Sequence, residues 1–80
     1  KDLKRMLKRG KDEKKIKEVL RRLIHQEPLE PKHRDHKLVG NWKDRRDCHV
    51  EPDWVLIYKP EIAEGRIIFE RTGTHSDLFR

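Results

Sequence analysis

The sequence has 80 residues, of which 32% are hydrophobic and 45% are charged. A chain of this length builds one domain with a small core and buries only about 60% of its unfolded surface. No apolar run approaches the roughly 20 residues of a membrane span, and no signal-peptide pattern is present. Cys48 is the only cysteine, which excludes an internal disulfide. These features exclude a membrane-spanning protein and predict a cytoplasmic one.

The positive charge is concentrated near the N-terminus. Residues 1–25 hold eleven Lys and Arg against four Asp and Glu, a net charge of +7, whereas residues 26–80 carry −1. Such a field attracts phosphate or an acidic protein partner. A solvated helix surface is the plainer alternative, because Lys-rich exposed helix faces are common.

Two amphipathic helices form a predicted helical hairpin over residues 1–25. Leu3, Met6 and Leu7 have helical spacing, and Gly10 suits the left-handed residue that ends a helix. Asp12 can cap the second helix. Its apolar stripe consists of Ile16, Val19, Leu20, Leu23 and Ile24. Both stripes fit the helical period closely, which indicates core packing and no cofactor contact.

Residues 26–41 lose this periodicity and contain Pro28, Pro31 and Gly40 together with a charged cluster at 33–37. Long polar loops are uncommon in compact domains unless they are functional or disordered. We therefore expect this segment to be an active-site loop.

From residue 42 onward the pattern predicts a sheet and a terminal helix. Residues 45–50 alternate, with Arg46, Cys48 and Val50 on a core face and Arg45, Asp47 and His49 on a polar face. A second strand is expected over 54–58, a turn over 60–65 and a third strand over 66–72, which gives an antiparallel meander.

Thr74 and Asp77 resemble a capping box, so a short helix should carry Leu78 and Phe79 back to the sheet. The predicted fold class is therefore α+β. Two N-terminal helices pack on a small antiparallel sheet with a short C-terminal helix, all in one domain over 1–80.

Four side chains at strand ends or in turns suggest chemistry: His49, Asp53, Arg71 and His75. Cleavage of RNA without a metal needs a base for the ribose 2′-hydroxyl, an acid for the departing 5′-oxygen and a cation for the phosphate. Histidine and arginine supply these groups. Taken singly, each histidine is more often an ordinary surface residue.

Two rival interpretations place other chemistry on these segments, and the aromatic residues could contact RNA. A zinc site could be drawn from His33, His36, Cys48, His49 and His75. However, adjacent residues of a strand point to opposite faces, so Cys48 and His49 cannot easily share one metal. A Cys48 nucleophile is disfavoured because its side chain is expected to face the core. Trp42, Trp54, Tyr58 and Phe79 could stack on bases, with Phe79 the best candidate and Tyr58 expected in the core.

The runs HVEPDWVLIY at 49–58 and RTGTHSDLF at 71–79, with RDHKL at 34–38 and GNWK at 40–43, together resemble the YafQ branch of the RelE-type toxins. The resemblance covers essentially the whole chain. It implies a RelE-like fold and the toxin of a type II toxin–antitoxin system. Such a toxin is a ribosome-dependent, metal-independent endoribonuclease that cuts mRNA in the decoding site through attack of the ribose 2′-hydroxyl.

The resemblance also implies the partners and the site. A cognate antitoxin neutralises the toxin, and the basic N-terminal helices are expected to contact ribosomal RNA. Acid–base and phosphate-binding roles fall on His36, His49, Asp53, Arg71 and His75. Trp54 and Phe79 would support the site and contact RNA, and no metal or other cofactor is implied.

The chain also departs from this family pattern. It begins with Lys1, within the first predicted helix, so we expect a trimmed chain without the first family strand, which would leave one position of the sheet unpaired. Asp44 and Arg45 stand where a glycine and an aromatic residue are expected. The principal alternative function is a catalytically silent module that binds RNA or the antitoxin.

Overall fold

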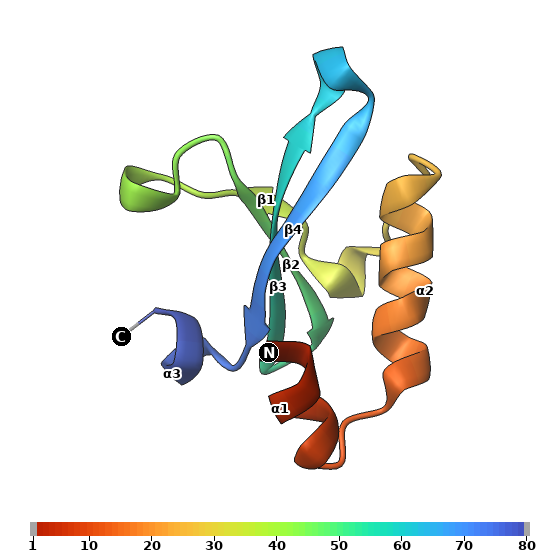
Figure 1. Cartoon of the computed structure of the whole chain (residues 1–80), viewed down its shortest axis with the longest axis vertical. Coiled ribbons are helices and arrows are strands. Elements are labelled where there is room, and N and C mark those ends of the chain that lie inside the picture. The colour runs from red at the N-terminus through yellow and green to blue at the C-terminus, as the bar shows by residue number, and fades with distance from the viewer. Residues whose placement is uncertain (1, 80) are drawn as a thin grey trace.

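The computed structural model describes residues 2–79. Two helices come first, and a four-stranded sheet and a short helix follow (Figure 1). The elements are α1 (Asp2–Lys8), α2 (Glu13–Ile24), β1 (His36–Lys37), β2 (Arg46–Glu51), β3 (Trp54–Glu61), β4 (Arg66–Gly73) and α3 (His75–Leu78). The sheet is antiparallel in the order β1-β2-β3-β4. The predicted α+β fold class is confirmed.

The two N-terminal helices begin and end at the residues that the sequence indicates. Gly10 follows α1 with a φ of +87°, a backbone conformation that glycine adopts without strain. The Asp12 carboxylate accepts a hydrogen bond of 2.9 Å from the backbone N–H of Lys14 and so caps α2. The expectation that Ile24 belongs to the core is wrong, because this last residue of α2 is 60% exposed.

The main core lies between the two N-terminal helices and one face of the sheet. Its buried members are Met6, Ile16, Val19, Leu23, Cys48, Val50, Trp54, Leu56 and Tyr58. Cys48 and Val50 thus lie on the predicted core face of β2, and Tyr58 is buried as expected. Alternate residues of β3 contribute to this core because successive side chains of a strand point to opposite faces.

The other face of the sheet is also buried, contrary to the expected polar surface. Val55 and Ile57 pack against Leu78 of α3, with Leu38 and Trp42 partly buried beside them. The polar residues of β2 on this face are covered as well, with Asp47 3% and His49 7% exposed. The alternation assigns each residue to a face correctly, but it does not indicate that another segment covers that face.

The third and fourth strands are longer than the sequence predicts. Pro60 lies inside β3 opposite Ile67, and the turn is confined to a 3₁₀ helix at Ile62–Glu64 followed by Gly65. The expected turn over 60–65 is therefore too long. β2 pairs with β3 only as far as Tyr58, so Pro60 lies where β3 has a neighbouring strand on one side alone, a position that tolerates proline.

The segment 26–41 contains short regular elements, whereas a continuous loop was the expectation. It comprises a 3₁₀ helix at Pro31–His33, the edge strand β1, and most of a second 3₁₀ helix at Gly40–Trp42. Arg34 has a φ of +44° and turns the chain from the first 3₁₀ helix into β1. The segment therefore lies against β2 along part of its length.

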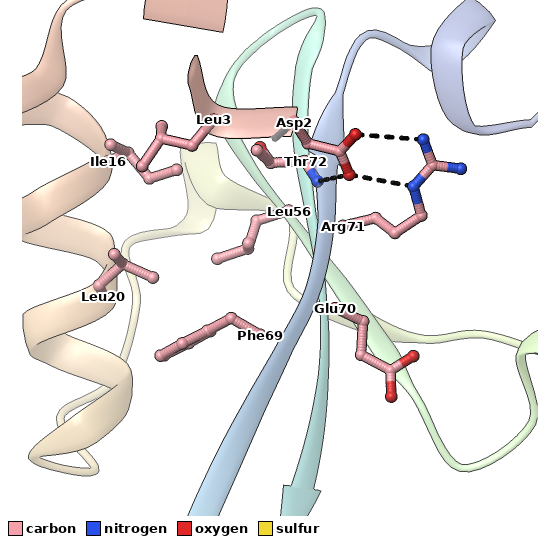
Figure 2. Close-up of a pocket in the computed structure, with 9 residues that line it drawn as sticks. All are labelled: Asp2, Leu3, Ile16, Leu20, Leu56, Phe69, Glu70, Arg71 and Thr72. Atoms are coloured by element: carbon pink, nitrogen blue, oxygen red, sulfur yellow. Dashed lines mark hydrogen bonds and ion pairs between the residues drawn. The ribbon is translucent and has the colours of Figure 1, made fainter. Parts of the chain in front are cut away.

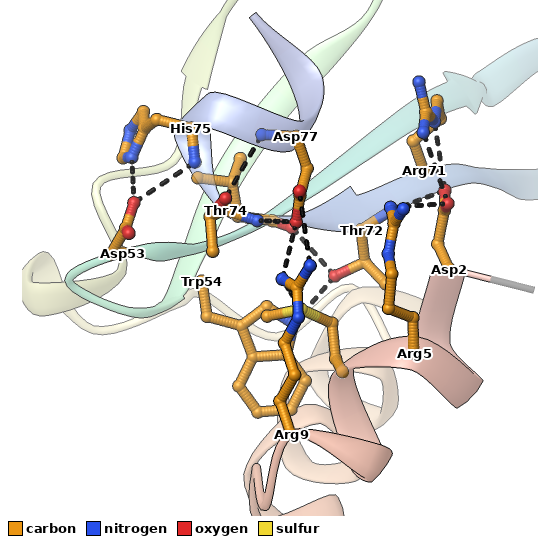
Figure 3. A network of polar contacts seen from close by, with 12 residues as sticks. Asp2, Arg5, Arg9, Asp53, Trp54, Arg71, Thr72, Thr74, His75 and Asp77 are labelled. Atoms are coloured by element: carbon orange, nitrogen blue, oxygen red, sulfur yellow. Dashed lines mark hydrogen bonds and ion pairs between the residues drawn. The ribbon is translucent and has the colours of Figure 1, made fainter.

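The predicted capping box of the C-terminal helix is present. The Thr74 hydroxyl accepts from the N–H of Asp77 at 3.1 Å, and the Asp77 carboxylate accepts from the N–H of Thr74 at 3.0 Å. Arg9, in the turn after α1, donates to the same carboxylate at 2.8 Å, which links α3 to the N-terminal helical segment (Figure 3). Leu78 returns to the core, but Phe79 remains 37% exposed, contrary to expectation.

We expect Thr74→Ala to lower the free energy of unfolding by about 1 kcal/mol, the usual cost of losing an N-cap. The loss should appear in chemical denaturation and as faster hydrogen exchange at the Asp77 N–H. Thr74→Ser, which keeps the hydroxyl, is the control. Equal stability of the Ala variant and the native protein would show that the cap contributes nothing.

Candidate active site

Two histidines that are distant in sequence meet on the face of the sheet away from α1 and α2. His49 lies on β2 and His75 is the first residue of α3. Their ring centroids are 5.1 Å apart and their planes are inclined by 62°. The His49 residue is 7% exposed, and the side chain of His75 is 50% exposed. One ring is therefore held by packing, while the other is open to a ligand.

Asp53 orients the His75 ring. It lies in the two-residue turn between β2 and β3, and its Oδ1 atom is 2.7 Å from His75 Nδ1 and 3.1 Å from the His75 backbone N (Figure 3). These hydrogen bonds from His75 hold the pKa of Asp53 below its ordinary value. A carboxylate acceptor keeps the proton on Nδ1, which leaves Nε2 of His75 available for proton transfer.

His36 approaches the same face from β1. It lies opposite Asp47 in the register of β1 and β2. Its Nδ1 is 2.7 Å from the Arg34 carbonyl oxygen and 2.9 Å from Asp47 Oδ1. The direction of the N–H favours the carbonyl, so the hydrogen bond to Arg34, two residues earlier in the chain, holds the side chain of His36.

Asp47 also lies at the site, although the alternation of residues along β2 predicts only that it lies on a polar face. Its Oδ1 atom is buried and accepts no hydrogen bond within residues 2–79. Burial raises the pKa of Asp47, while the nearby His36, His49 and His75 act in the opposite direction. The available signal was its position two residues before His49, on the same face of β2.

Arg71 is not brought to the two histidines by this structure. It lies on the Asp47 face of the sheet, because Ile57 is paired with both residues. Its guanidinium donates from Nε and Nη2 to the Asp2 carboxylate at 3.0 and 3.2 Å. Figure 3 shows this pair at one end of the polar network and Asp53 with His75 at the other.

Arg71 and Asp2 also border a pocket of about 470 Å³ between the N-terminal helices and β4. Figure 2 shows apolar side chains on its helix side and the ion pair on the far side of β4. Leu3, Leu20 and Phe69 are among the lining residues, and neither His49 nor His75 is. The candidate acid–base pair therefore lies outside this pocket.

The two aromatic residues expected to contact RNA have different environments. Trp54 is 0% exposed, and its Nε1 donates to the Thr72 hydroxyl at 2.9 Å. The expectation that Trp54 contacts RNA is wrong for this structure, although the ring supports the strands that carry the site. Phe79 is 37% exposed, with its ring centroid 6.2 Å from His75 and 6.4 Å from Trp42.

The zinc and cysteine alternatives find no support in the geometry. Within residues 2–79 no three His, Cys, Asp or Glu side chains are arranged to hold a metal ion. Cys48 is buried on the opposite face from His49, and burial raises the pKa of its thiol to about 12. A thiol in that state is a poor nucleophile.

Among the described helices, none is long and apolar enough to span a bilayer.

The chain matches a family model described as the bacterial toxin of type II toxin–antitoxin systems, YafQ, over residues 1–80. It is 50% identical over 80 residues to the mRNA interferase toxin YafQ of Escherichia coli K12, covering 99% of this chain and 85% of the relative.

Solved structures agree with this match. Crystalline YafQ from E. coli BL21(DE3) aligns with a TM-score of 0.91 at 46% identity, over 99% of this chain and 87% of that one. The E. coli DinJ–YafQ toxin–antitoxin complex aligns with a TM-score of 0.87 at 49% identity, over 99% of this chain and 86% of that one. A metal-bound toxin from Helicobacter pylori aligns with a TM-score of 0.90 at 42% identity, over 98% of this chain and 87% of that one.

We expect Asp47→Asn to raise the free energy of unfolding at pH 7 by about 1 kcal/mol, because it removes a buried negative charge whose Oδ1 atom accepts no hydrogen bond. A raised pKa in the folded state penalises the ionised form at high pH. The advantage of the variant should therefore shrink as the pH falls through the raised pKa of Asp47 toward the ordinary value of a carboxyl group, and it should be gone below that value. Urea denaturation between pH 3 and pH 7 measures the gain in stability at pH 7 and its loss at low pH. A variant less stable than the native protein at pH 7 would contradict this expectation.

Proposed function

The chain belongs to the YafQ family of bacterial toxins of type II toxin–antitoxin systems, and from this premise we propose that it cuts mRNA in the ribosomal decoding site by histidine acid–base catalysis. As an mRNA interferase it is an endoribonuclease. The observation that carries the catalytic proposal is the approach of the His49 and His75 rings to 5.1 Å between centroids.

The proposed reaction is an attack of the ribose 2′-hydroxyl on the adjacent phosphorus. A base removes the 2′-hydroxyl proton while the new P–O bond forms, and an acid protonates the 5′-oxygen while the P–O bond to it breaks. The products are a 2′,3′-cyclic phosphate and a 5′-hydroxyl. Each proton transfer contributes about 10²–10⁴ in rate when the group is correctly placed.

His75 and either His49 or His36 exchange the two protons in this proposal. Asp53 supports the assignment of His75, because it leaves Nε2 as the reactive nitrogen. His49 is close enough to act on the same phosphate, whereas His36 approaches from the outer strand. Phe79, half-exposed beside His75, would stack on a base next to the scissile bond.

Arg71 holds the phosphate in this proposal, and to do so it must exchange partners. Two of its nitrogen atoms donate to the Asp2 carboxylate, which has the same planar arrangement of two oxygens that a phosphate offers. Phosphate would therefore compete with Asp2 for the guanidinium. The side chain is 39% exposed, so it is accessible for the exchange.

The partners proposed for this chain are a cognate antitoxin and the translating ribosome. The DinJ–YafQ complexes support the proposed antitoxin partner, because they join related toxins to an antitoxin. The basic N-terminal helices support ribosomal RNA contacts. Lys4, Lys8 and Lys14 are exposed and form no ion pair within residues 2–79, so their charge is available to phosphate.

We expect His75→Gln and His49→Gln to lower the rate of mRNA cleavage on purified ribosomes by about 10²–10⁴, since each removes a proton-transfer group. Primer extension on translated message measures the rate and locates the cuts. His25→Gln, an exposed residue after α2, is the matched control and should cut normally. Full cleavage by both active-site variants would refute the assignment.

The role of metal is tested in the same assay. A chelator selective for transition metals leaves ribosomal Mg²⁺ in place and should not change the rate of this histidine reaction. Loss of cleavage, restored by zinc or copper, would instead favour a metal-dependent reaction, for which the metal-bound H. pylori relative gives a precedent for binding.

We expect Lys4→Gln with Lys8→Gln to weaken ribosome binding and to reduce the slope of log affinity against log salt by about 0.7–0.9 for each phosphate that is no longer neutralised. Binding would be measured by sedimentation with 70S ribosomes between 50 and 200 mM salt, roughly the range where counterion release dominates. Lys59→Gln, whose native ammonium group pairs with Glu61 on the sheet, is the control. An unchanged slope in the double variant would remove α1 from the interface.

A further inference from the structure

The outer edge of β2 is only partly paired. β1 contributes two residues, which lie opposite Arg46 and Asp47. Beyond Asp47 no strand among the described residues continues along this edge, although β2 runs to Glu51. An unpaired buried backbone carbonyl costs free energy, so a partner is needed for the part of β2 that carries His49.

His33 supplies that partner. Its Nδ1 is 2.7 Å from the backbone carbonyl oxygen of His49, and because a carbonyl only accepts, Nδ1 carries the proton and donates. The residue is 8% exposed and ends the 3₁₀ helix Pro31–His33, which packs against β2. The imidazole therefore takes the place that a longer β1 would have along this edge.

The hydrogen bond falls where β2 is least regular. His49 lies opposite Val55, but Glu51 lies opposite Trp54, so Val50 is the extra residue of a β-bulge. The bulge turns Glu51 toward the helices, where it accepts from Lys11 and Lys15. His49, just before the bulge, points toward the opposite face and is the last regularly paired residue of β2 before the register shifts.

We propose that His33 is a positioning residue for His49: its ring holds the backbone at the bulge so that the His49 imidazole stands against His75. This inference rests on the proposed acid–base function. His33 itself does not enter the reaction, because its ring borders a groove with Lys14, Lys15 and Arg22 on the helix side of the sheet. A displacement of about 1 Å can cost about 10² in rate, so a single backbone anchor has catalytic weight.

The test uses three substitutions of His33 in the full chain. His33→Asn places an amide N–H where Nδ1 stands and can keep the hydrogen bond. His33→Leu keeps an apolar side chain without a donor. His33→Gln keeps a polar amide but extends it past the Nδ1 position, and it replaces the Leu variant should that one fail to fold.

Single-turnover cleavage over a range of ribosome concentrations gives both the maximal rate and KM, and it separates positioning from stability. We expect His33→Leu and His33→Gln to cut about 10 to 100 times more slowly while KM stays within about threefold. His33→Asn should recover most of the rate. Native rates in the folded Leu or Gln variant, or an Asn variant no faster than those two, would overturn the proposal.

Ring-to-ring nuclear Overhauser effects between His49 and His75 provide a readout that needs no activity. They should be present in the native protein and in His33→Asn, and weakened in the other two variants at temperatures where all are folded. If the native protein does not cut message, the acid–base function fails, and these signals still decide the role of His33. Equal signals in all four proteins would refute it.

Discussion

Burial of β3 on both faces is the constraint on which the rest of the structure depends. Trp54–Tyr58 are all nearly or fully buried, so apolar side chains of one strand need cover on both sides of the sheet. The N-terminal helices cover one face, and α3 with Leu38 and Trp42 covers the other. The second cover comes from the segments that carry His36 and His75. Packing of the core therefore also positions the candidate site.

The sequence located features that depend on neighbouring residues and missed those that depend on distant ones. Gly10 and the Thr74 capping box were predictable because their physical reasons lie within one turn of chain. The burial of Asp47 was not, because alternation along a strand names a face without naming what packs on it. The hydrogen bond from His33 to His49 joins a loop to a strand and leaves no periodic signal.

The candidate site combines two carboxylates whose environments act in opposite directions. Asp53 is exposed and accepts from His75, which lowers its pKa, whereas burial raises the pKa of Asp47 beside His36. Groups with pKa values shifted apart are typical of acid–base sites. A buried carboxylate oxygen without a hydrogen bond also costs stability, a cost that packing elsewhere must offset. The site therefore departs from what stability alone would favour.

Positive charge and acid–base chemistry occupy opposite faces of the sheet. Most cations of the helices are paired, as in the contacts of Lys11 and Lys15 with Glu51, so the long-range field comes from fewer groups than the composition indicates. That field acts over roughly 10 Å at moderate salt, while proton transfer needs contact within about 3 Å. Attraction to an RNA surface and cleavage within it can therefore vary independently. The Arg9–Asp77 ion pair is one physical link between the two faces, because it joins the turn after α1 to the helix that carries His75.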